Sequence, residues 1–544
     1  MPRRPSFALK PTSREITRDE VCELIDAFKS KLHADIVLDV ARASESTSDA
    51  LAALLELAGG VPEPTSESAS SARVHAQDDA FGGFLPNDVR DLIFARLSAR
   101  DGAMLACTCR EFRALVGTWR REQRHLDLPL GSKTRASARN GEEFIHSARV
   151  GSMMRAYANV SSVSFKKLAP ALKPAVDAAD GDVEDGCRAI VMVLDAMAAS
   201  NSSHSITSID FENCGEWLSE GDVVEVTERV AAGFPNVHAL AFPRARRLTG
   251  KGLFRMLACY DGERLRELRL PGCTSLDEEA FKLILEHARS LRTLDVTGCS
   301  GLKQLRLDAH EGSRLEVIKA VNCAAMTTFS IRRSSTSSAL RTVNVADCTA
   351  LRLLHVQSSS LESLNAAGCR AMDEFNVFAP RCETLLLNRC AAFRAYTGEM
   401  NTVRTTLTAV RTLTLDNCKS LTSSGFDDLM RMCGATLEAL SAEGCFAIDR
   451  ATIVAPNLIK CSFSGSFALQ VVRVSSARCE MFIARACKEL IEVRFENGAS
   501  RLETFDVRNS PNLKRVIGVR ERRVRRLALA GCPASIEFIE NHFS

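Results

Sequence analysis

Apolar residues recur at fixed offsets through roughly the last two-thirds of the chain. Leu265–Cys273 reads LRELRLPGC, Leu291–Cys299 reads LRTLDVTGC and Leu340–Cys348 reads LRTVNVADC, and the same spacing continues to Val524–Cys532. Apolar and polar residues alternate inside each unit, which predicts a short strand with one buried face. A single strand of this kind cannot bury its apolar face alone, so the repetition predicts a stack of coils that cover one another.

The ninth position of the repeat is occupied mainly by cysteine. Cysteine is a small apolar residue with a weak S–H donor, so we expect it to lie where the chain turns inward and to satisfy loop carbonyls. An evenly spaced column does not cluster its members as a metal site requires, so we predict a structural role and no metal. The position is filled by Cys214, Cys273, Cys299, Cys323, Cys348, Cys369, Cys390, Cys418, Cys445, Cys487 and Cys532, and in other turns by Ala245, Ser466 and Ser510.

These units predict an α/β fold, a leucine-rich-repeat solenoid of the cysteine-containing type, with about fifteen turns over residues 159–544. The intervals between ninth positions range from 21 to 31 residues. The longer intervals contain helix-period segments, such as Asp277–Arg289 and Ser423–Cys433. The 21-residue intervals have no room for a helix and instead carry alternating runs at 351–356, 372–377 and 469–474. We therefore expect long helical turns mixed with short β-rich turns on the convex side.

Residues 85–119 carry a different pattern, LPNDVRDLIFARLSARDGAMLACTCREFRALVGTW, with apolar positions at helical spacing. One interpretation is a plain helical cap for the solenoid. The segment also resembles an F-box, although Arg90, Gly102 and Thr108 stand where that family usually has apolar residues. An F-box ahead of cysteine-containing repeats is similar to plant and green-algal F-box/leucine-rich-repeat proteins. The resemblance implies an all-α F-box over 81–127 that docks on a Skp-type adaptor through Leu85, Pro86, Asp88, Val89, Ile93, Phe94, Leu97, Leu105, Cys109, Phe112 and Trp119.

The N-terminal residues 15–58 are predicted to form a small helical bundle. The segment resembles the ubiquitin-binding CUE/UBA fold, which would place Phe28, Leu54 and Leu55 on ubiquitin, but Lys29 replaces the usual Pro. A bundle without ubiquitin binding is the alternative. Residues 1–14 read as a disordered tail, 59–80 as a flexible linker rich in Pro, Ser and Glu, and 128–158 as a connector.

Composition and charge narrow the classes of function. The chain has 70 basic and 67 acidic residues, a net charge of +3, so nothing in it requires nucleic acid or a membrane as partner. The 20 cysteines follow the repeat in a long chain, which favours reduced thiols and a cytoplasmic or nuclear location over a disulfide framework. No catalytic constellation, metal-ligand cluster or cofactor motif is recognisable, so we expect no enzyme and no cofactor.

Function is then expected on surfaces. The fifth repeat positions should point to the concave face and form a candidate substrate surface. A basic run, Lys514–Arg526, is either a solvated edge or a docking site for an acidic or phosphorylated segment. The candidate substrate residues are Arg269, Asp295, Lys319, Asn344, Asn365, Thr414, Arg522, Arg523 and Arg525.

The F-box resemblance implies a substrate-recognition subunit of a Skp–cullin–F-box ubiquitin ligase, which meets the cullin and RING subunits through the adaptor and binds a protein substrate of unknown identity. The alternative is a ligase-independent interaction scaffold that binds ubiquitin through 15–58. A small-molecule sensor with a pocket at the concave rim is a third class.

Overall fold

The computed structural model describes residues 124–128, 150, 154–157, 159–166, 184–200, 203–260, 263–309, 314–333, 339–396 and 407–540. The bundle at 15–58, the linker at 59–80 and the F-box-like residues 85–119 lie outside these ranges, as do all the adaptor-binding and ubiquitin-binding residues predicted from them. The chain divides into two compact units, Met1–Val163 with Ala196–Ser205, and Ser164–Asp195 with Ile206–Ser544. The first contains strand β1 (His125–Asp127) and most of β2 (Ser162–Ser164).

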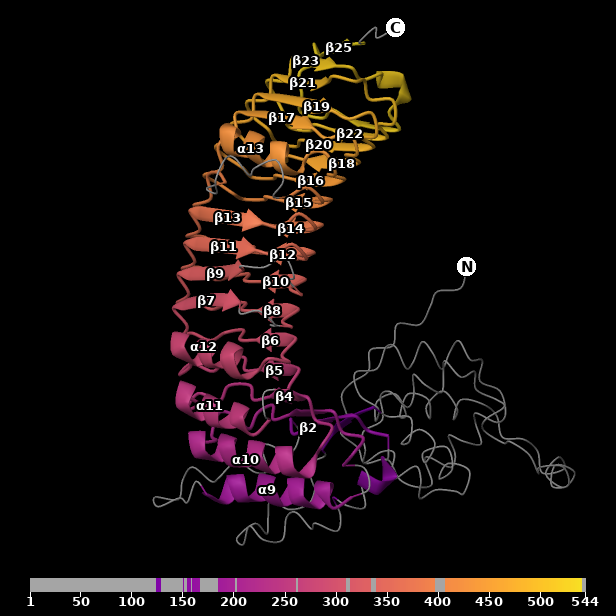
Figure 1. Cartoon of the computed structure of the whole chain (residues 1–544). Helices are drawn as coiled ribbons and strands as arrows, with labels where there is room; N and C mark the ends of the chain where they lie inside the picture. The colour runs from indigo at the N-terminus through magenta and orange to yellow at the C-terminus, as the bar shows by residue number, and fades with distance from the viewer. Residues whose placement is uncertain are drawn as a thin grey trace, which may run out of the picture. The chain divides into compact units, whose positions relative to one another are not determined.

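The second unit is built on a long parallel sheet in which each coil adds one short strand. The central residue of most strands is buried and its two neighbours face outward, as Thr293, Leu294 and Asp295 do. Figure 1 shows this sheet lining the inner side of the curved stack. Its strands are β3 (Ser208–Asp210), β4 (Ala239–Ala241), β5 (Glu267–Arg269), β6 (Thr293–Asp295), β8 (Val317–Lys319), β10 (Thr342–Asn344), β12 (Ser363–Asn365), β14 (Thr384–Leu386), β15 (Thr412–Thr414), β16 (Ala439–Ser441), β18 (Lys460–Ser462), β20 (Met481–Ile483), β22 (Thr504–Asp506) and β24 (Arg526–Ala528).

The other side of the stack changes from helices to strands as the intervals shorten (Figure 1). The first long turns carry α9 (Glu184–Ala198), α10 (Glu220–Gly233), α11 (Gly250–Ala258) and α12 (Glu278–His287). A four-stranded parallel sheet follows, made of β7 (Gln304–Ala309), β9 (Thr328–Arg333), β11 (Leu353–Gln357) and β13 (Glu374–Phe378). After α13 (Ser423–Cys433), a five-stranded sheet continues with β17 (Arg450–Val454), β19 (Val471–Ser475), β21 (Glu492–Phe495), β23 (Arg515–Ile517) and β25 (Glu537–Ile539).

The predicted convex elements are confirmed. Helix α13 occupies Ser423–Cys433, and α12 lies within the predicted 277–289 and begins where the Asp277 carboxylate accepts from the Ala280 amide at 3.1 Å. The alternating runs at 351–356, 372–377 and 469–474 form β11, β13 and β19. Interval length therefore decides the convex structure, because a 21-residue coil must close before a helix and its connections can fit. The second unit is a leucine-rich-repeat solenoid with mixed turns, the predicted fold class.

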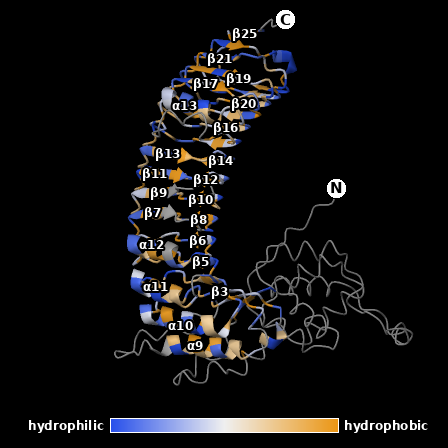
Figure 2. Cartoon of the chain, viewed as in Figure 1, coloured by the Kyte–Doolittle hydropathy of each residue, from blue (hydrophilic) through white to orange (hydrophobic). Residues whose placement is uncertain are grey.

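The core of the solenoid is a set of apolar columns that run from coil to coil. Aromatic residues share one column in the first coils, where the ring centroids of Phe211 and Phe242 are 4.6 Å apart and those of Phe165 and Phe211 are 4.8 Å apart. These three side chains are fully buried. Figure 2 shows hydrophobic and hydrophilic residues on each of the convex helices, the pattern of an amphipathic helix that packs one face inward.

From Cys273 onward, the ninth-position side chain joins its coil to the one before it. The Sγ of Cys273 donates to the carbonyl of Phe242 at 3.4 Å, and Cys369 donates to Val345 at 3.2 Å. In both cases the acceptor stands at the sixth position of the preceding coil. The contact recurs, always at 2.9 to 3.4 Å, for Cys299, Cys323, Cys348, Cys390, Cys418, Cys445, Cys487 and Cys532.

The substituted ninth positions support the same interpretation. Ser466 donates from its hydroxyl to Ala442 at 3.0 Å, and Ser510 donates to Ala484 at 3.1 Å. Both serines are fully buried. The expectation that this position satisfies loop carbonyls is confirmed for cysteine and serine, so a small side chain with one donor can replace sulfur, whereas the buried Ala245 fills the position without a donor.

The eighth position has a backbone requirement that the sequence template did not include. In every coil from Asn213 to Gly531 its φ is positive, between 55° and 79°. Gly298, with φ of 72°, adopts this left-handed conformation without steric cost, whereas Ala486, with φ of 55°, adopts it under strain. Glycine, Asn and Asp fill most of these positions because they tolerate the left-handed region best.

Substitution at Cys369 tests the inter-coil hydrogen bond. Cys369→Ala removes the donor to the buried Val345 carbonyl and the packing of the sulfur, so we expect it to lower the free energy of unfolding by about 2 kcal/mol. Cys369→Ser keeps a donor of the kind seen at Ser466, so we expect a loss of about 1 kcal/mol. Urea unfolding of the full chain measures both values. A serine variant no more stable than the alanine variant would show that the hydrogen bond contributes nothing.

Candidate interaction surface

The outward residues of the long sheet form one continuous face. Five of the predicted substrate-binding residues are consecutive register partners on neighbouring strands: Arg269 with Asp295, Asp295 with Lys319, Lys319 with Asn344, and Asn344 with Asn365. Thr414 lies in the same column, two strands further along. The structure therefore brings these six residues into a single row that crosses the middle of the inner face.

Several members of this row already have partners within the coil. The side-chain oxygen of Asp295 accepts from the amide of Thr297 at 3.0 Å. Asn344 and Asn365 accept in the same way from the amides two residues on, at 3.1 and 3.0 Å. These contacts hold the turn that follows each strand, so the three side chains have a structural role whether or not they bind a substrate.

The other three members of the row differ in whether their polar groups are exposed and available to a binding partner. The Nε of Arg269 donates to the Glu267 carboxylate on its own strand at 2.7 Å. Lys319 is exposed, and the hydroxyl of Thr414 is buried without a hydrogen bond to any described residue. Lys319 is thus the charged group of this row best placed to bind an acidic residue of a substrate.

A buried carboxylate network follows further along the same face, and sequence reasoning did not find it. Asp506, which is 4% exposed, accepts from Arg485 Nε at 2.7 Å and from Arg508 Nη2 at 2.9 Å. Burial acts to raise the pKa of Asp506, but the hydrogen bonds from Arg508 and Arg485 outweigh it and hold the pKa below its usual value. Arg485 belongs to the preceding coil, so only the register of the stack reveals this pairing.

The predicted basic run is partly neutralised in the structure. Arg515 lies 3.3 Å from Glu492, Arg520 lies 3.6 Å from Glu540, and Arg525 lies 3.3 Å from Glu503. Arg522 and Arg523 are exposed in a short 3-10 helix, Glu521–Arg523. Of the three arginines predicted to dock an acidic segment, two are therefore accessible and the third is already ion-paired.

The second position of the repeat carries a further column, with four arginine–glutamate pairs between neighbouring coils, that was not anticipated. Arg292 pairs with Glu316 at 3.3 Å, and Arg341 pairs with Glu362 at 3.0 Å. Arg411 pairs with Glu438 at 3.1 Å, and the Arg525–Glu503 pair belongs to the same column. All are exposed ion pairs between neighbouring coils, and each contributes about 0–1 kcal/mol to stability. They therefore affect the charge distribution on this surface more than the stability of the fold.

Burial limits the chemistry of the described cysteines. All cysteines in the described ranges are free thiols, and burial raises the pKa of Cys382 and of Cys433 to about 12. Such thiols are poor nucleophiles at neutral pH. No group of three or more His, Cys, Asp or Glu side chains in the described part of the chain could hold a metal ion. Every helix within the same ranges is too short or too polar to cross a bilayer.

Comparison with known proteins gives distant structural likenesses. Neither a sequence family nor a curated protein matches the chain. A complex of Rad7 and Elc1 from yeast matches with 12% identity and a TM-score of 0.28, over 61% of this chain and 84% of the other. A leucine-rich repeat protein from Bacteroides thetaiotaomicron matches with 10% identity and a TM-score of 0.29, over 71% of this chain and 52% of the other. The third match is the functional domain of InlJ from Listeria monocytogenes, which includes a cysteine ladder. It has 12% identity and a TM-score of 0.17, over 54% of this chain and 74% of the other. At these scores the likenesses carry no argument about function, and the fold assignment rests on the coils themselves.

The Asp506 network predicts a pH dependence of stability. A carboxylate whose pKa is lowered in the folded state stabilises the fold at pH values above its pKa in the unfolded chain, about 3.9. This stabilisation is lost as the pH falls through the pKa of the folded state. We expect Asp506→Asn to have a lower Tm than wild type at pH 7, and the difference to shrink as the pH falls below about 4. Thermal unfolding of both proteins across this range measures the difference. A gap that stays constant with pH would exclude an ionised Asp506 as its origin.

Proposed function

We propose that the chain is a non-catalytic substrate-recognition subunit of a Skp–cullin–F-box ubiquitin ligase. The observation that carries this proposal is the F-box-like sequence at 85–119, directly ahead of a solenoid of cysteine-containing leucine-rich repeats. A docking motif that precedes an extended polar face in the chain is what a receptor needs to hold an adaptor and a substrate at once.

The mechanism would be proximity. The F-box residues, Leu85 and Pro86 foremost, would bind a Skp-type adaptor and through it the cullin and RING subunits. The row from Arg269 to Thr414, together with the exposed Arg522 and Arg523, would bind the protein substrate. Holding both partners on one chain raises the effective concentration of substrate lysines near the ligase-bound conjugating enzyme, so the chain itself needs no reacting group.

Two properties of the described residues support this role. The inner face is polar and continuous over many coils, which suits an extended protein segment more than a small molecule. The buried thiols are free, which is compatible with the reducing cytoplasm or nucleus where such ligases would act. An interaction scaffold that recruits no ligase, and binds ubiquitin through Phe28, Leu54 and Leu55, is the second candidate because residues 15–58 resemble a ubiquitin-binding fold.

Capture of the adaptor tests the proposal. We expect the full chain to retain a Skp-type adaptor and a cullin, and Leu85→Ala/Pro86→Ala to reduce retention at least about tenfold, because two apolar contacts of a small interface are lost. Leu54→Ala/Leu55→Ala is the matched control: it also removes two apolar side chains ahead of the solenoid, and it should leave adaptor retention unchanged.

The possible failures are distinct. Absence of adaptor from the wild-type complex, or equal retention by Leu85→Ala/Pro86→Ala, would refute the ligase role. Adaptor without any cullin would favour the scaffold, and loss of ubiquitin binding in the Leu54→Ala/Leu55→Ala variant would identify residues 15–58 as its ubiquitin-binding part.

A further inference from the structure

The arginine–glutamate column at the second position is interrupted near its start. Arg292, Arg341 and Arg411 each face a glutamate at the second position of the next coil. Arg266 has His238 before it and Arg292 after it in this column, and it makes no ion pair with any described residue. A positive charge is therefore left without the carboxylate that the pattern supplies elsewhere.

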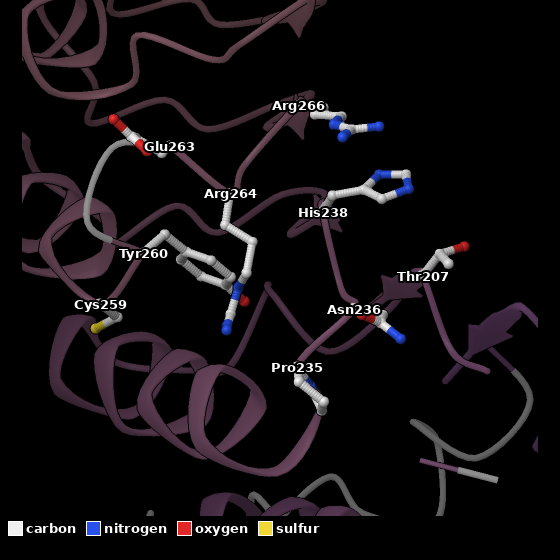
Figure 3. Close-up of a pocket in the computed structure, with 9 residues that line it drawn as sticks. All are labelled: Thr207, Pro235, Asn236, His238, Cys259, Tyr260, Glu263, Arg264 and Arg266. Atoms are coloured by element: carbon white, nitrogen blue, oxygen red, sulfur yellow. The ribbon is translucent and has the colours of Figure 1, made fainter. Parts of the chain in front are cut away.

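A hollow of about 630 Å³ lies at this interruption (Figure 3). It is lined by the second-position residues that directly precede β3, β4 and β5, and by residues of the loops that follow α10 and α11. Three cationic or potentially cationic groups line it, Arg264, Arg266 and His238, against one carboxylate, Glu263. In Figure 3 the Glu263 carboxylate points away from His238 and Arg266, so the hollow keeps an excess of positive charge.

Donors in this hollow lack acceptors. Tyr260 is 3% exposed, and its hydroxyl, which lies against the Arg264 guanidinium, has no acceptor for its own hydrogen among the described residues. The buried Nε of Arg264 is likewise without an acceptor among the described residues. Leaving a buried donor without an acceptor costs about 1–3 kcal/mol, so two such donors in one hollow call for an acceptor.

Some of these groups also have a structural role. The Arg264 guanidinium lies 4.7 Å from the centre of the Tyr260 ring, and its Nη2 donates to the Ala231 carbonyl near the end of α10 at 2.9 Å. These contacts fix the guanidinium over the ring without engaging Nε. They leave Nε available, and they keep Tyr260 and Arg264 side by side as Figure 3 shows. The pair is thus preorganised, which lowers the entropic cost of binding a ligand.

The electrostatics at His238 show that the positive charge of Arg266 is not compensated there. Burial, and then the charge of Arg266, lower the pKa of His238, while its backbone hydrogen bond and Glu267 oppose them. An anion beside His238 and Arg266 would offset the charge of Arg266 and favour the protonated form of His238.

We propose that this hollow, the Tyr260 pocket, binds a phosphomonoester group. A phosphate carries about −1.5 to −2 charges near pH 7 and three strong acceptor oxygens. It can therefore accept from the Tyr260 hydroxyl, Arg264 and Arg266 together, which a single carboxylate with two oxygens does less completely. The group would come from a small phosphorylated metabolite or from a phosphorylated serine or threonine of a peptide. The proposal does not depend on adaptor binding.

Calorimetric titration of the full chain tests the pocket. The probes are O-phosphoserine, as the free phosphomonoester, and a short capped peptide with one central phosphoserine; serine and the unphosphorylated peptide are their blanks. We expect saturable one-site binding of a phosphorylated probe and none of its blank. Comparable affinity for both probes would assign recognition to the phosphate alone, and tighter binding of the peptide would identify a phosphorylated protein segment as the source.

Variants keep the test specific. Arg266→Ala should weaken binding at least about tenfold by removing a charge-assisted hydrogen bond. Tyr260→Phe should weaken it about threefold to tenfold while keeping the ring beneath Arg264. Arg341→Ala, in the same column but paired with Glu362, is the matched control and should bind as wild type does.

The proposal is overturned if neither phosphorylated probe binds saturably, or if Arg266→Ala and Tyr260→Phe bind as tightly as wild type. An equal loss of binding in Arg341→Ala would also overturn it, since the effect would then be one of general surface charge.

Discussion

The solenoid depends on the hydrogen bond that a buried ninth-position side chain donates to the sixth-position carbonyl of the preceding coil. The chain must turn inward after each short strand, and this turn buries a carbonyl that has no place in the ladder of the sheet. A thiol or hydroxyl satisfies it at 2.9 to 3.4 Å without adding bulk, as at Cys369 and Ser466. Each such bond is modest, about 1 kcal/mol, but its repetition fixes how every coil sits on the last.

Fixing the coils in this way leaves other positions free to vary. The convex side changes from helices to strands with coil length, while the inner sheet keeps its register from β3 to β24. Outward positions on that sheet can then carry Lys319 or Arg269 at no cost to the core. The same freedom at the second position allows ion pairs between some neighbouring coils and leaves Arg266 unpaired. Binding surfaces thus arise where the stack does not dictate the residue.

The sequence predicted what depends on spacing within a coil. Helix α13, the convex strands and the donor role of Cys369 all follow from local periodicity and interval length. The pairings between coils could not be predicted in the same way, because Arg485 meets Asp506 and Arg341 meets Glu362 only when the register is known. The left-handed eighth position was visible in principle, since Gly, Asn and Asp recur there, but Ala486 and Arg389 obscure the pattern. The unsatisfied hydroxyl of Tyr260 depends on burial, which no local pattern reports.

The accessibility of the ladder thiols measures this central constraint most directly. Native full-length protein is alkylated with iodoacetamide, and modification of each cysteine is followed by mass spectrometry. The ladder thiols from Cys273 to Cys487 are fully buried and hydrogen-bonded, whereas Cys259 and Cys532 are half-exposed and serve as internal references. We expect the references to react while the ladder remains unmodified until urea unfolds the protein. Modification of Cys369 and its neighbours at the rate of Cys259 in the native protein would contradict the account.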